Sequence, residues 1–236
     1  MNPPILYVGG SKGGVGKSCM SFTLIDYLIE GGKKALLLET DTSNPDVFKA
    51  HASLQDGGML VCRELDLDLA DGWIELINLA DEFSDHVIVI NSAARSNSGI
   101  EKYGTTLKET LPELDRKLYT FWMINRQRDS LELLRDFRAS FGDAGSVNVF
   151  RNLYFGASEK FERYNNSKIR KQIEETGGGS FDFPDLADRV SDKIYSERRS
   201  ITQALKELPI GDRAELKRWR AKYFAIFDAL LEEKDG

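Results

Sequence analysis

Short runs of consecutive apolar residues alternate along this chain with longer stretches in which apolar residues recur at helical spacing. Four runs have the continuous apolar character of parallel strands that are covered on both faces: Ile5–Val8, Ala35–Leu38, Val87–Ile90 and Leu118–Ile124. Helical patterns separate these runs. This order predicts an α/β fold, a doubly wound, mostly parallel sheet flanked by helices on both faces.

Weaker patterns extend the prediction to the end of the chain. Further strands are expected at residues 59–65, 147–155 and 180–184. Helices are expected at residues 18–30, 72–83, 130–140, 201–208 and 212–231, with one more between residue 99 and about residue 114 and a basic helical segment before Gly177. No repeat, linker or low-complexity segment interrupts them, so residues 1–236 are expected to form a single domain.

A glycine-rich loop lies between the first predicted strand and the first predicted helix. Residues 11–18 read Ser-Lys-Gly-Gly-Val-Gly-Lys-Ser, close to the phosphate-loop pattern G-x-x-x-x-G-K-[ST], with Ser11 in place of the first glycine. Glycines let the backbone N–H groups wrap an anion, and the start of the helix adds its positive dipole end. A glycine-rich turn with a chance lysine is the alternative, which the flanking strand and helix disfavour.

The predicted nucleotide contacts follow from this pattern. Lys17 is expected to reach the β- and γ-phosphates, and the Ser18 hydroxyl to bind Mg²⁺. The rest of the expected nucleotide site comes from the loop and the first turn of the helix: Lys12, Gly13, Gly14, Val15, Gly16 and Cys19. Cys19 itself is expected to be a small buried side chain rather than a reactive thiol.

The second lysine of the loop, Lys12, gives the pattern K-G-G-x-G-K-[ST], which resembles the deviant phosphate loop of the ParA/MinD family. In that family the extra lysine crosses a dimer interface and touches the phosphates that the partner subunit holds. The resemblance therefore implies ATP and Mg²⁺ as cofactors and an ATP-dependent homodimer. The spacing of the loop alone would imply only a nucleotide site.

An acidic loop follows the second predicted strand, at the sheet edge where ligands of open α/β folds bind. Residues 39–46 read Glu-Thr-Asp-Thr-Ser-Asn-Pro-Asp, and the family usually has D-x-D-P there. By that resemblance Asp41 positions the attacking water, as phosphoryl transfer requires. Asp46 or Asn44 is a candidate for holding a Mg²⁺-bound water. A simple turn is the alternative, since Asn-Pro-Asp is also turn chemistry.

The third long apolar run ends in Asn91, where relatives carry the Walker B aspartate. An amide oxygen can hold a Mg²⁺-bound water but brings no negative charge. The replacement is expected to weaken metal binding or to slow hydrolysis. The predicted metal ligands are thus Ser18, Asp41, Asp46 and Asn91.

Three further residues are candidates for contacts with the base. Asn125 follows the strand 118–124, where the family commonly places an asparagine whose amide reads the adenine edge. An ordinary turn at Asn125 is an equal alternative. Pro184 and Asp185 follow the last predicted strand, where relatives have a proline-containing loop against the base.

Composition narrows the class of protein. Hydrophobic residues make up 41% of the chain and charged residues 30%, which is ordinary for a globular protein. No apolar run approaches the roughly 18 residues needed to span a bilayer, and no charged-then-apolar segment precedes the phosphate loop. The two cysteines, Cys19 and Cys62, suggest neither a disulfide framework nor a metal site. A cytoplasmic location is expected.

The net charge of −6 conceals a basic C-terminal region. Ten basic residues lie in it: Arg189, Lys193, Arg198, Arg199, Lys206, Arg213, Lys217, Arg218, Arg220 and Lys222. This surface is a candidate for contact with DNA or with an acidic partner such as a DNA-binding adaptor protein, and a solvated helix surface is the simpler alternative. The broad apolar face of helix 212–231 favours packing on the sheet or on a partner over membrane association.

These observations predict a dimeric switch that binds and slowly hydrolyses ATP. Within the ParA/MinD family, residues 39–46, Asn91 and the segment Arg-Asn-Leu-Tyr-Phe-Gly from Arg151 most resemble the plasmid-encoded StbB-type ATPases. That resemblance implies a role in plasmid DNA segregation, positioning or conjugative transfer. The alternatives are an ATP-dependent ligase or kinase of the dethiobiotin synthetase-like type, and a nucleotide-binding scaffold with little hydrolysis.

Overall fold

Seven parallel strands form the centre of the molecule in the computed structural model, which describes residues 1–10, 13–55, 58–94 and 97–231. The strands are β1 Ile5–Gly10, β2 Ala35–Glu39, β3 Leu60–Glu64, β4 Val87–Asn91, β5 Leu118–Ile124, β6 Ser146–Asn152 and β7 Gly179–Phe183. Their order in the sheet is β3-β2-β4-β1-β5-β6-β7, and every neighbouring pair is parallel. The prediction of a doubly wound parallel α/β fold is confirmed.

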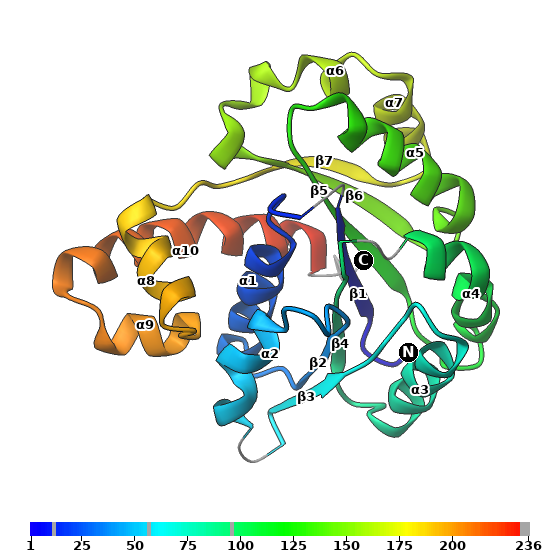
Figure 1. The fold of residues 1–236 in the computed structure, drawn as a ribbon, viewed down its shortest axis with the longest axis horizontal. Helices are drawn as coiled ribbons and strands as arrows, with labels where there is room; N and C mark the ends of the chain where they lie inside the picture. The colour runs from blue at the N-terminus through cyan, green and yellow to red at the C-terminus, as the bar shows by residue number, and fades with distance from the viewer. Residues whose placement is uncertain (11–12, 56–57, 95–96, 232–236) are drawn as a thin grey trace.

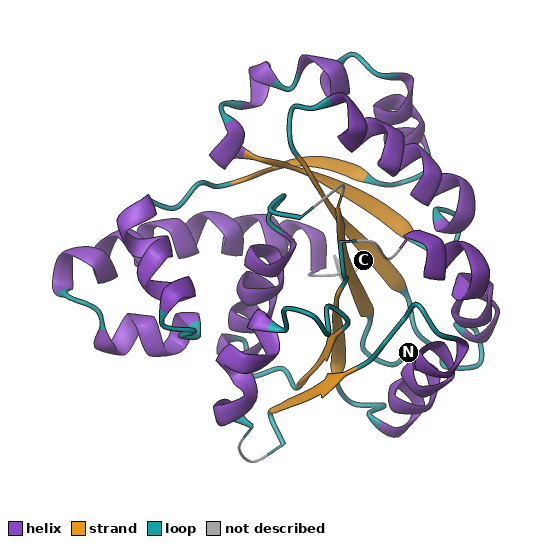
Figure 2. Cartoon of the chain, viewed as in Figure 1, coloured by secondary structure: helices purple, strands orange, loops and turns teal. Residues whose placement is uncertain are grey.

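Helices cover both faces of this sheet (Figure 1 and Figure 2). In chain order, the α-helices are α1 Lys17–Glu30, α2 Asp46–His51, α3 Ala70–Glu82, α4 Asn97–Thr110, α5 Arg128–Phe141, α6 Glu162–Asn165, α7 Lys168–Glu175, α8 Asp188–Ser196, α9 Ile201–Glu207 and α10 Ile210–Leu231. One core joins the sheet to α1, α2, α8, α9 and α10, and a second core joins it to α3, α4, α5, α6 and α7.

The two cores follow from the alternation of side chains along each strand. On β1, Leu6 and Val8 belong to the α1 core, whereas Ile5 and Tyr7 belong to the α3–α7 core. All four are almost fully buried, which explains why the strands read as continuous apolar runs rather than as alternating ones. Because the strands themselves are covered on both faces, a ligand site of this fold lies at the carboxyl ends of the strands, where polar residues follow.

Several element boundaries differ from the prediction. The strand expected over residues 147–155 ends at Asn152, where the Asn152 side chain accepts a hydrogen bond from the Tyr154 N–H and begins a 3₁₀ turn, Leu153–Phe155. The short helices α2 and α8 were not predicted. Residues 65–69, in which leucine alternates with aspartate, lie outside any strand, although Leu65 and Leu67 are buried.

Helix α10 packs against the body of the protein. Its apolar residues Leu216, Trp219, Tyr223 and Phe227 are buried in the core shared with α1, as the sequence favoured. Asp26 of α1 accepts hydrogen bonds from Arg220 and Tyr223 and fixes the crossing of the two helices. Within residues 1–10, 13–55, 58–94 and 97–231, the structure has no helix long and apolar enough to cross a membrane.

The basic C-terminal region is largely neutralised within the chain. Six of the ten basic residues form ion pairs with carboxylates: Arg189, Lys193, Arg198, Arg199, Arg218 and Arg220. Asp212, which is 5% exposed, accepts from both Arg189 and Lys193. This pairing reduces the positive field that the region could offer to nucleic acid.

Candidate phosphate-binding site

The glycine-rich loop has the backbone shape that its sequence predicts. Gly14 and Gly16 adopt φ values of +76° and +107°, a region that side chains with a Cβ rarely adopt. A Cβ on Gly16 would also lie 2.6 Å from Nδ2 of Asn152. Gly16 immediately precedes α1, so the loop leads directly to the unsatisfied N–H groups of a helix N-terminus. Lys12, the lysine that carries the family resemblance, lies outside the described residues.

Lys17 lies at the centre of the site. Its residue is only 8% exposed, and burial lowers the pKa of its ammonium group, while the nearby carboxylates of Asp41 and Glu39 act in the opposite direction. A buried cation beside two carboxylates is suited to binding an anion such as a phosphate. Ser18 lines the same cavity.

The acidic loop after β2 holds Asp41 in a turn. One carboxylate oxygen of Asp41, Oδ1, accepts from the Ser43 hydroxyl at 2.6 Å and from the Asn44 N–H at 3.2 Å. The Asn44 side chain in turn donates to Asp46 at 2.8 Å. The segment therefore forms the turn that its sequence favours, and Asp41, Asn44 and Asp46 also line the cavity, where the predicted site roles would require them.

Asn91 is fixed by hydrogen bonds on both sides of its amide. Its Oδ1 accepts from the Ser21 hydroxyl at 2.9 Å, and its Nδ2 donates to Oε1 of Glu39 at 2.8 Å. The Glu39 carboxylate also accepts from the Asp41 N–H at 3.1 Å. Burial raises the pKa of Glu39 to about 7, although these hydrogen bonds favour its charged form.

This arrangement explains the amide at position 91. Glu39 and Asn91 are register partners on adjacent strands, so their side chains meet at the carboxyl edge of the sheet. An aspartate in place of Asn91 would put two carboxylates in contact inside a buried site. In this protein the carboxylate of the pair is Glu39 on β2, whereas the Walker B position on β4 carries the amide of Asn91.

A cavity of about 500 Å³ opens at this edge of the sheet. It brings together most of the predicted site residues: Gly13, Gly14, Gly16, Lys17, Ser18, Cys19, Asp41, Asp46, Asn91, Pro184 and Asp185. Val15 does not line the cavity and packs in the core, 1% exposed. The hydroxyl, carboxylate and amide oxygens of the four predicted metal ligands are the donors that Mg²⁺ prefers, so the residues present fit this ion.

Asn125 is not among the described residues that line this cavity, and its contacts are those of the turn alternative. Its side-chain oxygen accepts from the Ser130 hydroxyl at 2.7 Å and from the Gln127 N–H at 2.9 Å, and so it forms the turn that leads into α5. The amide at the cavity is instead Asn152, which ends the neighbouring strand β6. The sequence signal was present, because Arg151-Asn152 also ends an apolar strand.

Aromatic residues to which the sequence analysis assigned no role in the site also line the cavity. Tyr154 and Tyr195 line it together with Trp219 of α10. The Trp219 indole donates to the Pro184 carbonyl at 2.8 Å, so the C-terminal helix holds the loop after β7 in place. Cys19 is half-buried rather than fully buried and lines the cavity, and desolvation raises the pKa of its thiol to about 11, which favours the protonated form.

Comparison with known proteins identifies the relatives of this chain. No family model matches it. Protein MobD of Acidithiobacillus ferrooxidans is 54% identical over 233 residues, which cover 99% of this chain and all of that protein. The chain belongs to the MobD family. The narrower resemblance to StbB-type ATPases is not confirmed by this match.

Solved structures with the same architecture include P-loop proteins of low sequence identity. The MinD cell division protein of Aquifex aeolicus aligns with a TM-score of 0.55 at 12% identity, over 94% of this chain and 97% of that chain. The cell division protein FtsY of Thermotoga maritima aligns with a TM-score of 0.52 at 18% identity, over 76% of this chain and 60% of that chain. A nucleotide-binding protein of Archaeoglobus fulgidus in complex with ADP aligns with a TM-score of 0.51 at 13% identity, over 83% and 86%. The fold is thus that of MinD-like P-loop proteins.

Proposed function

We propose that this MobD-family protein is a cytoplasmic ATP-binding switch that dimerises around ATP and Mg²⁺ and hydrolyses ATP slowly. The observation that carries the proposal is the buried Lys17 at the end of a loop whose glycines adopt positive φ. Lys17 interacts electrostatically with Asp41, and both residues line a cavity large enough for a nucleotide. The ADP bound to the similarly folded Archaeoglobus fulgidus protein agrees with this assignment.

The residues of the site have distinct roles in this proposal. Lys17 and the loop N–H groups hold the β- and γ-phosphates, and Lys12 acts across the dimer. Mg²⁺ would be held by Ser18 and Asp41 directly and by Asp46 and Asn91 through bound water. When bound, the ion neutralises part of the phosphate charge. Asp41 also orients the attacking water. Because Asn91 is neutral and already bonded on both sides, we expect slow turnover.

The cellular role is proposed from the relatives. The resemblance of residues 39–46 and of the segment from Arg151 to StbB-type ATPases supports a role in plasmid DNA segregation, positioning or conjugative transfer, and the name MobD hints at mobilisation. A DNA-bound adaptor protein is a better-supported partner than bare DNA, since most of the basic C-terminal residues are already paired with carboxylates.

Nucleotide titration by calorimetry, with and without Mg²⁺, tests the proposal. Wild-type protein should bind ATP, and Lys17→Met should lose roughly 100-fold in affinity, because a charge-assisted contact with phosphate is removed. Lys12→Ala should keep monomer binding and lose ATP-induced dimerisation. Phosphate release without any added acceptor would separate this switch from the ligase or kinase alternative, and ATP binding without phosphate release would favour the scaffold.

A further inference from the structure

A groove runs along the outer side of α5, where this helix meets α6 and α7 (Figure 1). Along α5, Arg128, Leu131, Arg135 and Arg138 follow one another at steps of three or four residues, so they lie on one face of the helix. They line two cavities of about 320 and 520 Å³, which have Arg135 in common. We call these two cavities together the arginine groove.

Arginines dominate the wall of the arginine groove. Four of them line it, against the carboxylates of Glu132 and Glu175: Arg128, Arg135, Arg138 and Arg163. Arg128 pairs with Glu132 at 2.8 Å, whereas the other three form no ion pair with any residue that the structure describes. The groove is therefore a positively charged surface on a chain whose net charge is −6, and it differs from the C-terminal region, where most of the basic residues are paired.

Arg138 has a donor that the chain itself leaves unused. Its Nη1 is buried and has no hydrogen-bond partner within residues 1–10, 13–55, 58–94 and 97–231. A cationic N–H that is withdrawn from water is unfavourable until an acceptor reaches it, and a guanidinium suits a carboxylate because two of its N–H groups can donate in parallel. Arg138 therefore points to an acidic group from outside the chain.

Apolar side chains lie between the arginines. Leu131 of α5 and Ile169 of α7 are buried beneath the groove, and Ala139 of α5 is exposed beside them. A groove between helices, with apolar residues along its floor and arginines at its sides, fits a helix that has one apolar stripe flanked by carboxylates. Nucleic-acid phosphates would instead cover the apolar floor without offering it an apolar group.

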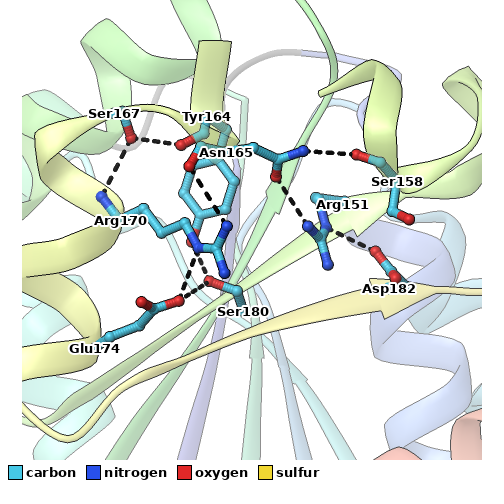
Figure 3. A network of polar contacts seen from close by, with 9 residues as sticks. All are labelled: Arg151, Ser158, Tyr164, Asn165, Ser167, Arg170, Glu174, Ser180 and Asp182. Atoms are coloured by element: carbon cyan, nitrogen blue, oxygen red, sulfur yellow. Dashed lines mark hydrogen bonds and ion pairs between the residues drawn. The ribbon is translucent and has the colours of Figure 1, made fainter. Parts of the chain in front are cut away.

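A network of polar contacts fixes α6 and α7 on the sheet (Figure 3). The Ser167 hydroxyl donates to the Tyr164 carbonyl at 2.7 Å just before α7, and the Tyr164 and Ser180 hydroxyls share a hydrogen bond of 2.7 Å that reaches β7. Arg151 of β6 pairs with Asp182 of β7 at 2.7 Å. One wall of the groove is thus fixed before a partner arrives, which lowers the entropic cost of docking.

We propose that the arginine groove docks an acidic, amphipathic helix of a partner protein. Apolar side chains of that helix pack on Leu131 and Ile169, and its carboxylates pair with Arg135 and Arg138. No residue that lines the groove also lines the nucleotide cavity in the part of the chain that the structure describes. The docking surface therefore does not depend on ATP binding, and it offers the partner protein a place other than the C-terminal basic region.

Two labelled synthetic peptides, titrated with the full-length protein in fluorescence anisotropy without nucleotide, test this proposal. The first is a helix-forming peptide of leucine, alanine and glutamate, about 18 residues and roughly 27 Å long, with its leucines on one face. The second has the same composition with the leucines scattered around the helix. Unlabelled duplex DNA serves as a competitor in a separate titration.

Two variants alter the groove in different ways. Arg135→Glu/Arg138→Glu reverses its charge, and Ala139→Trp fills it without changing the charge. Because Ala139 is exposed, this second variant leaves the core intact and keeps the test valid if the first is destabilised. Lys217→Glu/Lys222→Glu is the matched control, since it makes the same change in net charge at exposed positions of α10. Thermal unfolding checks that each variant is folded.

We expect the wild type to bind the amphipathic peptide about tenfold or more tightly than the scattered one, and both groove variants to lose about tenfold or more in affinity for it. The α10 control should bind as the wild type does. Equal binding of the two peptides, an equal loss in the control, or a wild type that binds neither peptide would overturn the proposal. Displacement of the peptide by DNA would assign the groove to nucleic acid and overturn it as well. A wild type that binds the amphipathic peptide but not ATP would support the groove and refute only the proposed nucleotide switch.

Discussion

Replacing Arg220 of α10 should destabilise the protein strongly, because it leaves a buried carboxylate without its cation. Asp26 of α1 is 4% exposed and accepts from Arg220 Nε at 2.7 Å and Nη2 at 3.2 Å, and from the Tyr223 hydroxyl at 2.6 Å. Arg220 also pairs with Glu30 at 2.9 Å. In Arg220→Met, Tyr223 is the one hydrogen-bond partner that Asp26 keeps among the described residues.

The expected magnitude follows from the burial of this pair. Removing one member of a buried ion pair costs about 3–5 kcal/mol, because the remaining charge stays desolvated. For a chain of this size, each kcal/mol lowers the melting temperature by about 2–4 °C, so a loss of roughly 6–20 °C is expected. Asp26→Leu should lose a similar amount. The double variant Asp26→Leu/Arg220→Met replaces the pair by apolar groups and should recover most of the loss.

Urea unfolding of the wild type, the two single variants and the double variant forms a double-mutant cycle. We expect a coupling energy of about 2 kcal/mol or more between the two positions. Single variants within 1 kcal/mol of the wild type, or losses that simply add in the double variant, would contradict this account of how α10 is held on α1.

Three further changes test other parts of the structure. Asn91→Asp should lower the free energy of unfolding by about 2–4 kcal/mol at neutral pH, because it places a second carboxylate against Glu39. The double variant Asn91→Asp/Glu39→Gln should regain the lost stability, which thermal unfolding measures. Arg116→Met should lower the free energy of unfolding in urea by about 3–5 kcal/mol without changing ATP affinity. The buried Arg116 guanidinium lies at the edge of the sheet opposite the cavity and donates to four backbone carbonyls, those of Pro3, Ala80, Phe83 and His86. A loss of less than about 1 kcal/mol would contradict the role of Arg116 in holding these segments together. Burial lowers the pKa of His51 from 6.5 to about 4, so the unfolded chain binds the proton first and stability is lost as pH falls between these values. His51→Leu should therefore gain about 3 kcal/mol relative to wild type between pH 7 and pH 4, and parallel pH profiles would refute this assignment.

The sequence predicted the elements whose signal is local. The apolar runs became the central strands because both faces of a parallel sheet are covered, and the glycines of the phosphate loop adopt the backbone angles that only they tolerate readily. Short helices such as α2 and α8 were missed because a helix of one or two turns is stabilised by packing rather than by its own pattern.

The base side of the cavity could not be predicted reliably, because it depends on where neighbouring strands end. Asn125 and Asn152 both follow apolar strands, and both can cap a turn. Only the structure shows that β6 carries its amide to the phosphate loop, while the amide after β5 turns into α5. The contribution of Trp219 was also invisible in the sequence, since its contact with Pro184 joins residues far apart in the chain.

The most direct test of the proposed switch is the molecular mass in solution with Mg²⁺ and, in separate samples, ADP, ATP or a non-hydrolysable ATP analogue. The account predicts a monomer with ADP and a dimer with ATP or its analogue, with the dimer lost in Lys12→Ala. A mass that is the same with every nucleotide would contradict the ATP-dependent dimer and would favour the enzyme or scaffold alternatives.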